Sequence, residues 1–141
     1  MPPFAEIETA DYSPAVKKAL LDLRAEIDVI VNNTEPATFN NTIMALEVTG
    51  DSLNKVAYTF SNITGTDTND ELRALQTQIY PMLTREADAI TLNDVLYQRV
   101  KAVFDARDSL NLGEQEARLL ELTHRGFLRA GAAFSPEVKN Q

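Results

Sequence analysis

Cysteine is absent from the 141-residue sequence, and His124 is its single histidine. The lack of cysteine excludes disulfide bonds, catalytic thiolates and cysteine-ligated zinc within the chain. A catalytic zinc ion usually takes three protein ligands, mostly histidines, and the pattern His-Glu-x-x-His does not occur. We therefore predict no catalytic, cofactor-binding or metal-binding residue in this chain. We interpret His124 as a helix-surface or partly buried side chain without a catalytic role.

Other catalytic patterns are also missing. No Gly-x-Ser-x-Gly nucleophile turn occurs, and the five glycines are too scattered for a phosphate-binding loop. Paired carboxylates do occur, and such pairs can carry out acid–base chemistry when burial separates their pKa values. We interpret them as helix caps or solvated surface, because they fall at termini and in the first turns of expected helices. The pairs are Glu6/Glu8, Asp67/Asp70 and Glu114/Glu116.

Basic residues are few: 13 Lys and Arg stand against 21 Asp and Glu, which gives a formal net charge of −8. Nucleic-acid binding needs clustered basic residues, and anionic membrane surfaces attract them, so we expect neither as a partner. No apolar run approaches the length of about 18 residues that spans a membrane. The first residues lack the basic and apolar regions of a signal peptide. We therefore expect a cytoplasmic protein; a leader removed ahead of Met1 is the open alternative.

Helical periodicity dominates from Ser13 onward, and it predicts an all-α bundle of about five helices in a single domain, residues 1–141. Hydrophobic residues make up 44% of the chain, enough for a real core. We expect the helices to begin at Ser13-Pro14, near Thr38, at a Thr68–Glu71 capping box, after Thr91–Asp94, and at Asn111–Glu114.

Two residues interrupt the expected helices. Gly50 lies on the apolar stripe of the second helix, which we expect to run from about Thr38 to Asn62. It favours close approach of a neighbouring helix, and a break in the helix is the alternative. Pro81 lies inside the third helix and should kink it.

The chain closes on Ser135-Pro136-Glu137, which repeats the Ser-Pro helix start at Ser13-Pro14. Only residues 135–141 remain for this helix, whereas isolated helices need roughly 12 residues to be stable in water. We interpret residues 135–141 as the start of a truncated next helix. A frayed natural tail is the alternative.

Several segments, in order and spacing, resemble the N-terminal region of bacterial dipeptidyl carboxypeptidases, which are thimet-oligopeptidase-like zinc metallopeptidases. Among them are residues 38–43 (TFNNTI), 45–53 (ALEVTGDSL) and 107–112 (RDSLNL). No single motif is strong, and it is the ordered set that is specific. The resemblance covers essentially the whole chain. Residues 39–46 and 107–112 favour dipeptidyl carboxypeptidase over its sister oligopeptidase A.

The resemblance implies a function for a larger parent enzyme. Such an enzyme is largely helical and two-lobed, uses zinc, and removes dipeptides from the C-termini of oligopeptides. Its zinc ligands lie in a downstream part that has no counterpart here, so this chain alone is expected to be inactive. The N-terminal helices would shape or cover the substrate channel. Their partners would be the C-terminal catalytic part of the same polypeptide and oligopeptide substrates.

A second interpretation remains open: a free-standing helical module that binds peptides or other proteins without catalysis. We further expect the isolated chain to expose an apolar surface and to self-associate. Several pairs of adjacent large residues lie roughly 100° apart on a helix, so one core can hardly cover both members. These pairs are Leu20-Leu21, Ile30-Val31, Leu119-Leu120 and Phe127-Leu128.

Overall fold

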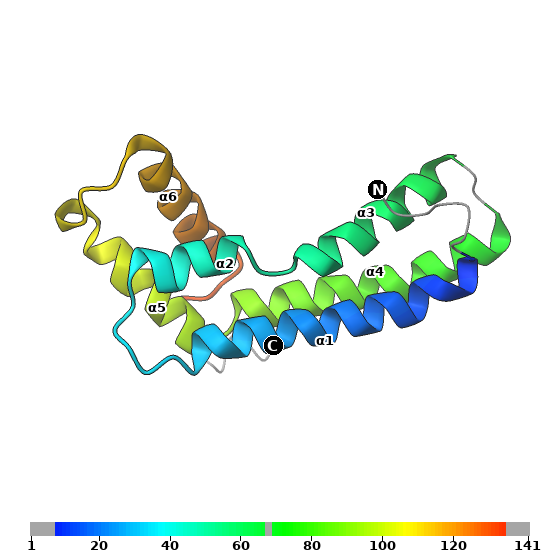
Figure 1. The fold of residues 1–141 in the computed structure, drawn as a ribbon, viewed down its shortest axis with the longest axis horizontal. Coiled ribbons are helices and arrows are strands. Elements are labelled where there is room, and N and C mark those ends of the chain that lie inside the picture. Colours follow the sequence, from blue (N-terminus) through cyan, green and yellow to red (C-terminus); the bar gives the residue numbers. More distant parts are fainter. Residues whose placement is uncertain (1–7, 67–68, 135–141) are drawn as a thin grey trace. The chain divides into compact units, whose positions relative to one another are not determined.

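The computed structural model describes residues 8–66 and 69–134 (Figure 1). These residues form helices and connecting turns, with no strand among them, which confirms the predicted all-α fold. The α-helices are α1 (Tyr12–Val31), α2 (Ala45–Glu47), α3 (Asp51–Thr66), α4 (Asp70–Thr91), α5 (Asp94–Asp105) and α6 (Glu114–Arg129). Short helical segments η2 (Thr9–Asp11), η3 (Phe39–Met44) and η4 (Arg107–Ser109) complete the set. None of the helices in the described ranges is long and apolar enough to cross a membrane.

The described residues group into two compact units. Unit 1 takes its residues from Met1–Glu26 and Thr49–Glu86, and unit 2 takes its residues from Ile27–Val48 and Ala87–Gln141. Helices α1 and α4 each contribute to both units, because the chain passes from one unit to the other within them. The organisation of residues 1–141 as a single domain stays a prediction.

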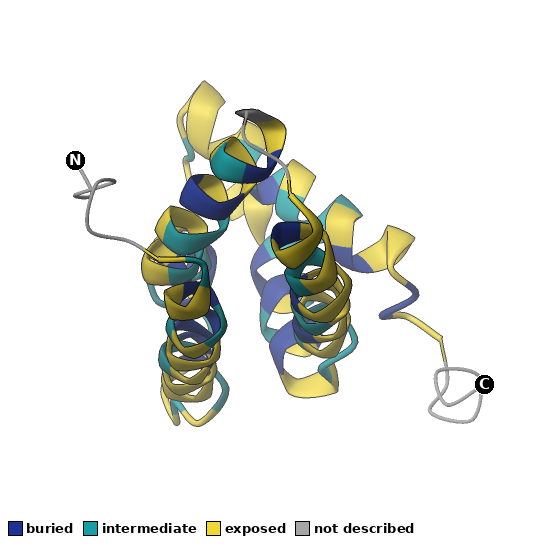
Figure 2. Cartoon of the chain, turned by 90° about the vertical axis from the view of Figure 1, so that its right-hand side faces the viewer, coloured by how far each residue is buried: buried dark blue, intermediate teal, exposed yellow. Residues whose placement is uncertain are grey.

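The core of unit 1 joins three helices. Apolar residues of α1, α3 and α4 meet in one cluster, and the Phe60 ring lies 5.2 Å from that of Tyr12 and 6.0 Å from that of Tyr80. In Figure 2 the buried residues form stripes between exposed ones along the helices, as the 3.6-residue period requires. The buried members of the cluster are Tyr12, Val16, Leu20, Phe60, Leu72 and Ile79.

The predicted helix from Thr38 to Asn62 is wrong as a single element. The chain forms a π-helix over Phe39–Met44 and a short α2, then breaks before α3 begins at Asp51. Gly50 lies at the break with φ of +76°, a left-handed conformation that no helix interior contains and that glycine adopts without strain. Helix α1 also approaches Gly50 closely, since a Cβ atom at Gly50 would lie 3.4 Å from Leu23 Cδ1.

Two helix starts differ from expectation by a residue or more. Helix α1 is preceded by η2, where the Glu8 N–H donates to Asp11 Oδ2 at 2.9 Å, so Ser13 lies inside the helix and is not its cap. Asn69 caps α4, because its Oδ1 accepts from Leu72 N at 2.9 Å. Thr68, the predicted cap of that helix, lies outside the described residues. The start of α5 is confirmed, with Asn93 Oδ1 accepting from Leu96 N at 2.9 Å.

Pro81 lies inside α4, and the helix is continuous past it. Proline removes one backbone donor, so the bond to the carbonyl four residues earlier cannot form there. The kink at Pro81 stays a prediction.

Unit 2 is built from η3, α2, α5, η4 and α6, together with the ends of α1 and α4. Thr38 and Asn41 cap η3 reciprocally: Thr38 Oγ1 accepts from Asn41 N at 3.0 Å, and Asn41 Oδ1 accepts from Thr38 N at 2.7 Å. Its buried apolar residues come from α1, η3, α5, α6 and the turn after α6. They are Ile27, Ile30, Phe39, Ile43, Leu96, Tyr97, Val100, Val103, Leu120, Phe127 and Ala132.

Helix α6 ends in a Schellman motif. The Ala132 N–H donates to Phe127 O at 3.0 Å and the Gly131 N–H to Leu128 O at 3.1 Å. Gly131 supplies the required positive φ of +92°. The helix start expected at Ser135-Pro136 lies outside the described residues.

Candidate functional site

His124 packs between aromatic side chains of α5. Its ring lies parallel to that of Phe104, with centroids 3.8 Å apart and 7° between planes, and it also stacks on Tyr97 at 6.3 Å. Its half-burial confirms the interpretation of a partly buried histidine. Burial lowers the pKa of His124, Asp105 opposes this shift, and Lys101 and Arg107 add to it.

The residues that the structure describes do not fit a catalytic zinc ion. Among them, no group of three His, Asp or Glu side chains lies close enough together to hold a metal. His124, the side chain best suited to zinc, is enclosed by rings and does not face two other potential ligands. The wider prediction that the chain contains no catalytic, cofactor-binding or metal-binding residue stays a prediction.

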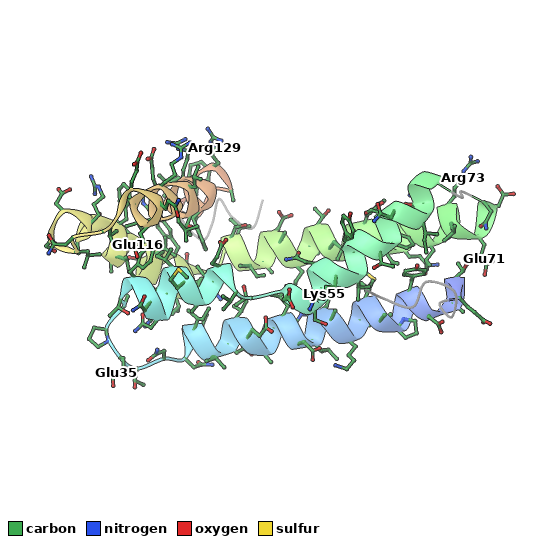
Figure 3. The ribbon with its side chains drawn as sticks, turned by 45° about the horizontal axis from the view of Figure 1, so that its top comes forward. Glu35, Lys55, Glu71, Arg73, Glu116 and Arg129 are labelled. Carbon is green, nitrogen blue, oxygen red and sulfur yellow. The ribbon has the colours of Figure 1, made fainter. Side chains whose placement is uncertain are left out.

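The acidic pairs lie at helix starts where they fall within the described residues. Glu114 and Glu116 are in the first turn of α6, and Glu116 Oε2 accepts from Gly113 N at 3.3 Å. Glu8 and Asp70 begin η2 and α4, whereas Glu6 and Asp67 lie outside the described ranges. Figure 3 shows six exposed charged side chains of the described ranges: Glu35, Lys55, Glu71, Arg73, Glu116 and Arg129.

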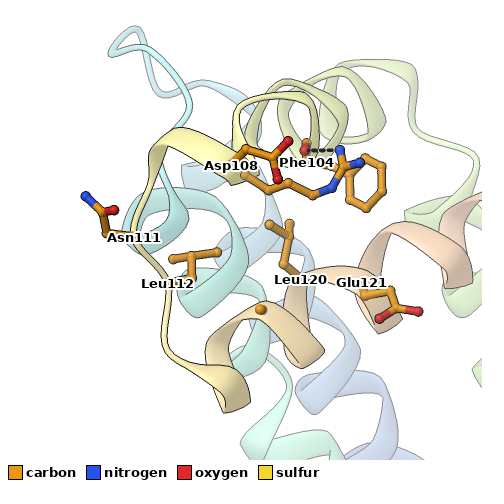
Figure 4. Close-up of a pocket in the computed structure, with 8 residues that line it drawn as sticks. Phe104, Asp108, Asn111, Leu112, Leu120 and Glu121 are labelled. Carbon is orange, nitrogen blue, oxygen red and sulfur yellow. Dashed lines mark hydrogen bonds between the residues drawn. The ribbon is translucent and has the colours of Figure 1, made fainter.

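The candidate site is a pocket of about 540 Å³ in unit 2, formed by the end of α5, η4 and the first half of α6 (Figure 4). We call it the α5–α6 pocket. Asp108 and Phe104 lie on one side of it and Leu120 and Glu121 on the other. Its lining residues are Phe104, Arg107, Asp108, Asn111, Leu112, Ala117, Leu120 and Glu121.

A stack of three side chains forms one side of the pocket. The Arg107 guanidinium carbon lies 4.1 Å from the centroid of the Phe104 ring, and Nη1 donates to Phe104 O at 2.8 Å. His124 lies at a similar distance from the same ring, so the two groups occupy opposite faces of Phe104. The cation–π contact and the hydrogen bond together fix the orientation of the guanidinium.

The turn from η4 to α6 places Leu112 at the pocket. Asn111 carries this turn in a left-handed conformation with φ of 52°, which asparagine tolerates better than most residues. Leu112 and Leu120 then form the apolar floor, as Figure 4 shows, and the Asn111 side chain points away from it.

The two carboxylates of the pocket differ. Glu121 forms an ion pair with Arg125, one turn further along α6. Asp108 has no ion pair or hydrogen bond within the described part of the chain, and its side chain is exposed. The pocket thus offers one unpaired anion beside a pre-oriented cation.

Arg99 holds a second polar network in unit 2. Its Nη1 donates to the carbonyl oxygens of Asn33 and Glu35, both at 3.1 Å, and its Nη2 donates to Asn41 Oδ1 at 3.1 Å. These bonds fix the loop after α1 against α5. Asn41 also bonds to Thr38, so this network is joined by hydrogen bonds to the start of η3.

The sequence placed residues 107–112 within the family resemblance and Asn111 at an expected helix start, but indicated no site there. Periodicity predicts which helix face is buried, but the α5–α6 pocket depends on where the turn of Asn111 directs the chain. The turn-forming residues Asp108, Ser109 and Asn111 were the available signal.

No protein-family model matches the chain. Curated proteins do match it: dipeptidyl carboxypeptidase of Escherichia coli (strain K12) is 41% identical over 138 residues, which are 98% of this chain and 20% of that protein. The dipeptidyl carboxypeptidase of Salmonella typhimurium is 37% identical over the same share of each chain. Oligopeptidase A of Salmonella typhimurium is 26% identical over 141 residues, 21% of its length. The chain therefore spans about a fifth of the length of these relatives.

Proposed function

The chain is similar throughout to the N-terminal region of dipeptidyl carboxypeptidases in the thimet-oligopeptidase-like family, and we propose that it serves such an enzyme as its N-terminal helical region. The enzyme would be a zinc-dependent peptidyl-dipeptidase that removes C-terminal dipeptides from oligopeptides. The single observation that carries this proposal is the 41% identity over 98% of the chain. The identity to oligopeptidase A is lower, at 26%, and this difference supports dipeptidyl carboxypeptidase over oligopeptidase A as the type of parent enzyme.

The role of the chain in this proposal is to shape or cover the substrate channel. Catalysis and zinc binding would be the work of the remaining four-fifths of the polypeptide, its principal partner. The composition of the chain supports this division, because a catalytic zinc ion usually takes three protein ligands, mostly histidines, and the sequence has one histidine and no cysteine.

The test compares three preparations: the 141-residue chain, the full polypeptide encoded by its reading frame, and that polypeptide without residues 1–141. Each is incubated with a short peptide and the released products are identified by mass spectrometry. We expect C-terminal dipeptides from the full polypeptide with zinc and none from the 141-residue chain. Dipeptide release by the chain alone, after removal of contaminating peptidases, would contradict the proposal.

The channel role has its own readout. Removal of residues 1–141 should alter which substrate lengths are cleaved, because the channel wall would be incomplete. Unchanged length selectivity would contradict that role. A stop codon directly after Gln141 would instead favour a free-standing helical module that binds peptides or proteins.

A further inference from the structure

We propose that the α5–α6 pocket binds a short peptide with both ends free, with Asp108 receiving the ammonium group and Arg107 the carboxylate group. The assignment of the ammonium group to Asp108 and of the carboxylate group to Arg107 rests on the pocket alone. The choice of peptides among zwitterionic molecules rests on the proposed function.

The anionic partner is Asp108. It lines the pocket, its carboxylate is exposed, and no hydrogen bond or ion pair engages it among the described residues. Glu121, the other carboxylate of the lining, is already paired with Arg125. An ammonium group entering the pocket therefore meets one carboxylate that is free to accept its hydrogen bonds.

The cationic partner is Arg107. Stacking on Phe104 and the bond from Nη1 to Phe104 O hold its guanidinium in place. A guanidinium has five N–H donors, so this bond leaves several for a ligand. A planar group held in one orientation loses little freedom when it binds a carboxylate through two parallel hydrogen bonds.

The floor of the pocket is apolar. Leu112 and Leu120 form it (Figure 4), and Ala117 also lines the pocket. The volume of about 540 Å³ lies within the range of small-molecule sites, which is roughly 300–1,000 Å³. An apolar side chain next to the two charged ends would cover this floor. The rim is exposed, so we expect modest affinity, with a Kd of about 1 mM.

The experiment titrates alanyl-leucine into the 141-residue chain and follows backbone amide shifts by NMR. Two blocked ligands, N-acetyl-alanyl-leucine and alanyl-leucine amide, each remove one charge. Asp108→Asn and Arg107→Gln remove the matching protein charges. Asp28→Asn on α1 and Arg129→Gln on α6 are the matched controls, because both side chains are exposed and lie outside the pocket lining.

We expect saturable shifts at residues 104–121, and about two- to fivefold weaker binding for each blocked ligand or pocket variant, as measured for exposed ion pairs. Acetylation should cost nothing further in Asp108→Asn, and amidation nothing further in Arg107→Gln. The controls should bind as the unaltered chain does. Because Asp108 is exposed, its substitution tests the charge without disturbing the fold.

Equal binding of the free and blocked dipeptides, or no saturable shift in the pocket, would overturn the proposal. Free leucine binding as tightly as the dipeptide would overturn the assignment to peptides. None of these measurements involves hydrolysis, so failure here is distinguishable from failure of the proposed peptidase function.

Discussion

His124 of α6 and Phe104 of α5 lie face to face, with ring centroids 3.8 Å apart and only 7° between their planes. This contact joins the two helices beside the candidate pocket, and Arg107 covers the other face of Phe104. A neutral imidazole can pack on an aromatic ring at a smaller cost in hydration free energy than a protonated one. A protonated one would place a third cation beside Arg107 and Lys101, with Asp105 as the compensating negative charge.

The first prediction concerns pH. Burial lowers the pKa of His124 from its ordinary value of 6.5, so the unfolded chain takes up this proton at a higher pH than the folded chain does. The His124 contribution to stability is therefore fully present above pH 6.5 and is lost as pH falls through the lowered pKa of the folded state. Urea unfolding between pH 7.5 and pH 5 checks this.

The matched variant for this measurement is His124→Phe, which keeps a ring on Phe104 but does not titrate. Stability of the unaltered chain should fall more steeply on acidification than stability of the variant. Carboxylates that pair in the fold contribute equally to both, so the difference isolates His124. Parallel curves would show that the histidine has no part in acid sensitivity.

The second prediction concerns Arg99. Arg99→Lys keeps the charge but cannot reach three acceptors with one ammonium group, so the bonds to Asn33, Glu35 and Asn41 cannot all form. We expect a loss of about 1–2 kcal/mol in the free energy of unfolding. Arg73→Lys, at an exposed position on α4, should change it by less than about 0.5 kcal/mol. Equal effects of the two substitutions on the free energy of unfolding would show that the Arg99 hydrogen bonds do not stabilise the fold.

The third prediction contrasts two glycines. Gly50→Ala should destabilise the chain by about 1–2 kcal/mol, because alanine is strained at a φ of +76°. Gly126→Ala should stabilise it by about 0.5–1 kcal/mol, since Gly126 lies inside α6 with nothing near its missing Cβ. Thermal unfolding of both variants decides the signs, and a stabilising Gly50→Ala would contradict the conformation at the break.

The fourth prediction is self-association of the isolated chain. In each pair of adjacent large residues one member is buried and the other is less so; Leu20 is 4% and Leu21 62% exposed, and Phe127 is 5% and Leu128 42% exposed. Sedimentation over a range of concentrations should show a rising average mass, which Leu21→Gln together with Leu128→Gln should reduce. A monomer at high concentration that binds no hydrophobic dye would favour a self-sufficient module.

Local chemistry determined much of the fold from the sequence. The 3.6-residue spacing of apolar residues marked the helices, and Asn93 and Gly113 marked starts that the structure retains. The sequence did not identify the capping residue where two suitable side chains are adjacent. Thr68 and Asn69 can both cap a helix, and which one does so depends on the backbone that precedes it.

The break at Gly50 and the α5–α6 pocket were decided by tertiary structure. From the sequence, Gly50 could mark either the close approach of a neighbouring helix or a break in its own helix. Leu23, which limits the space at Gly50, comes from another helix, so the sequence around Gly50 could not reveal it. Residues 107–112 were visible as a motif, yet only the folded chain brings Phe104, Arg107 and Asp108 of one segment against Ala117 and Leu120 of α6. Helical periodicity is a local property of the backbone, whereas a pocket depends on the direction of turns, which long-range packing fixes.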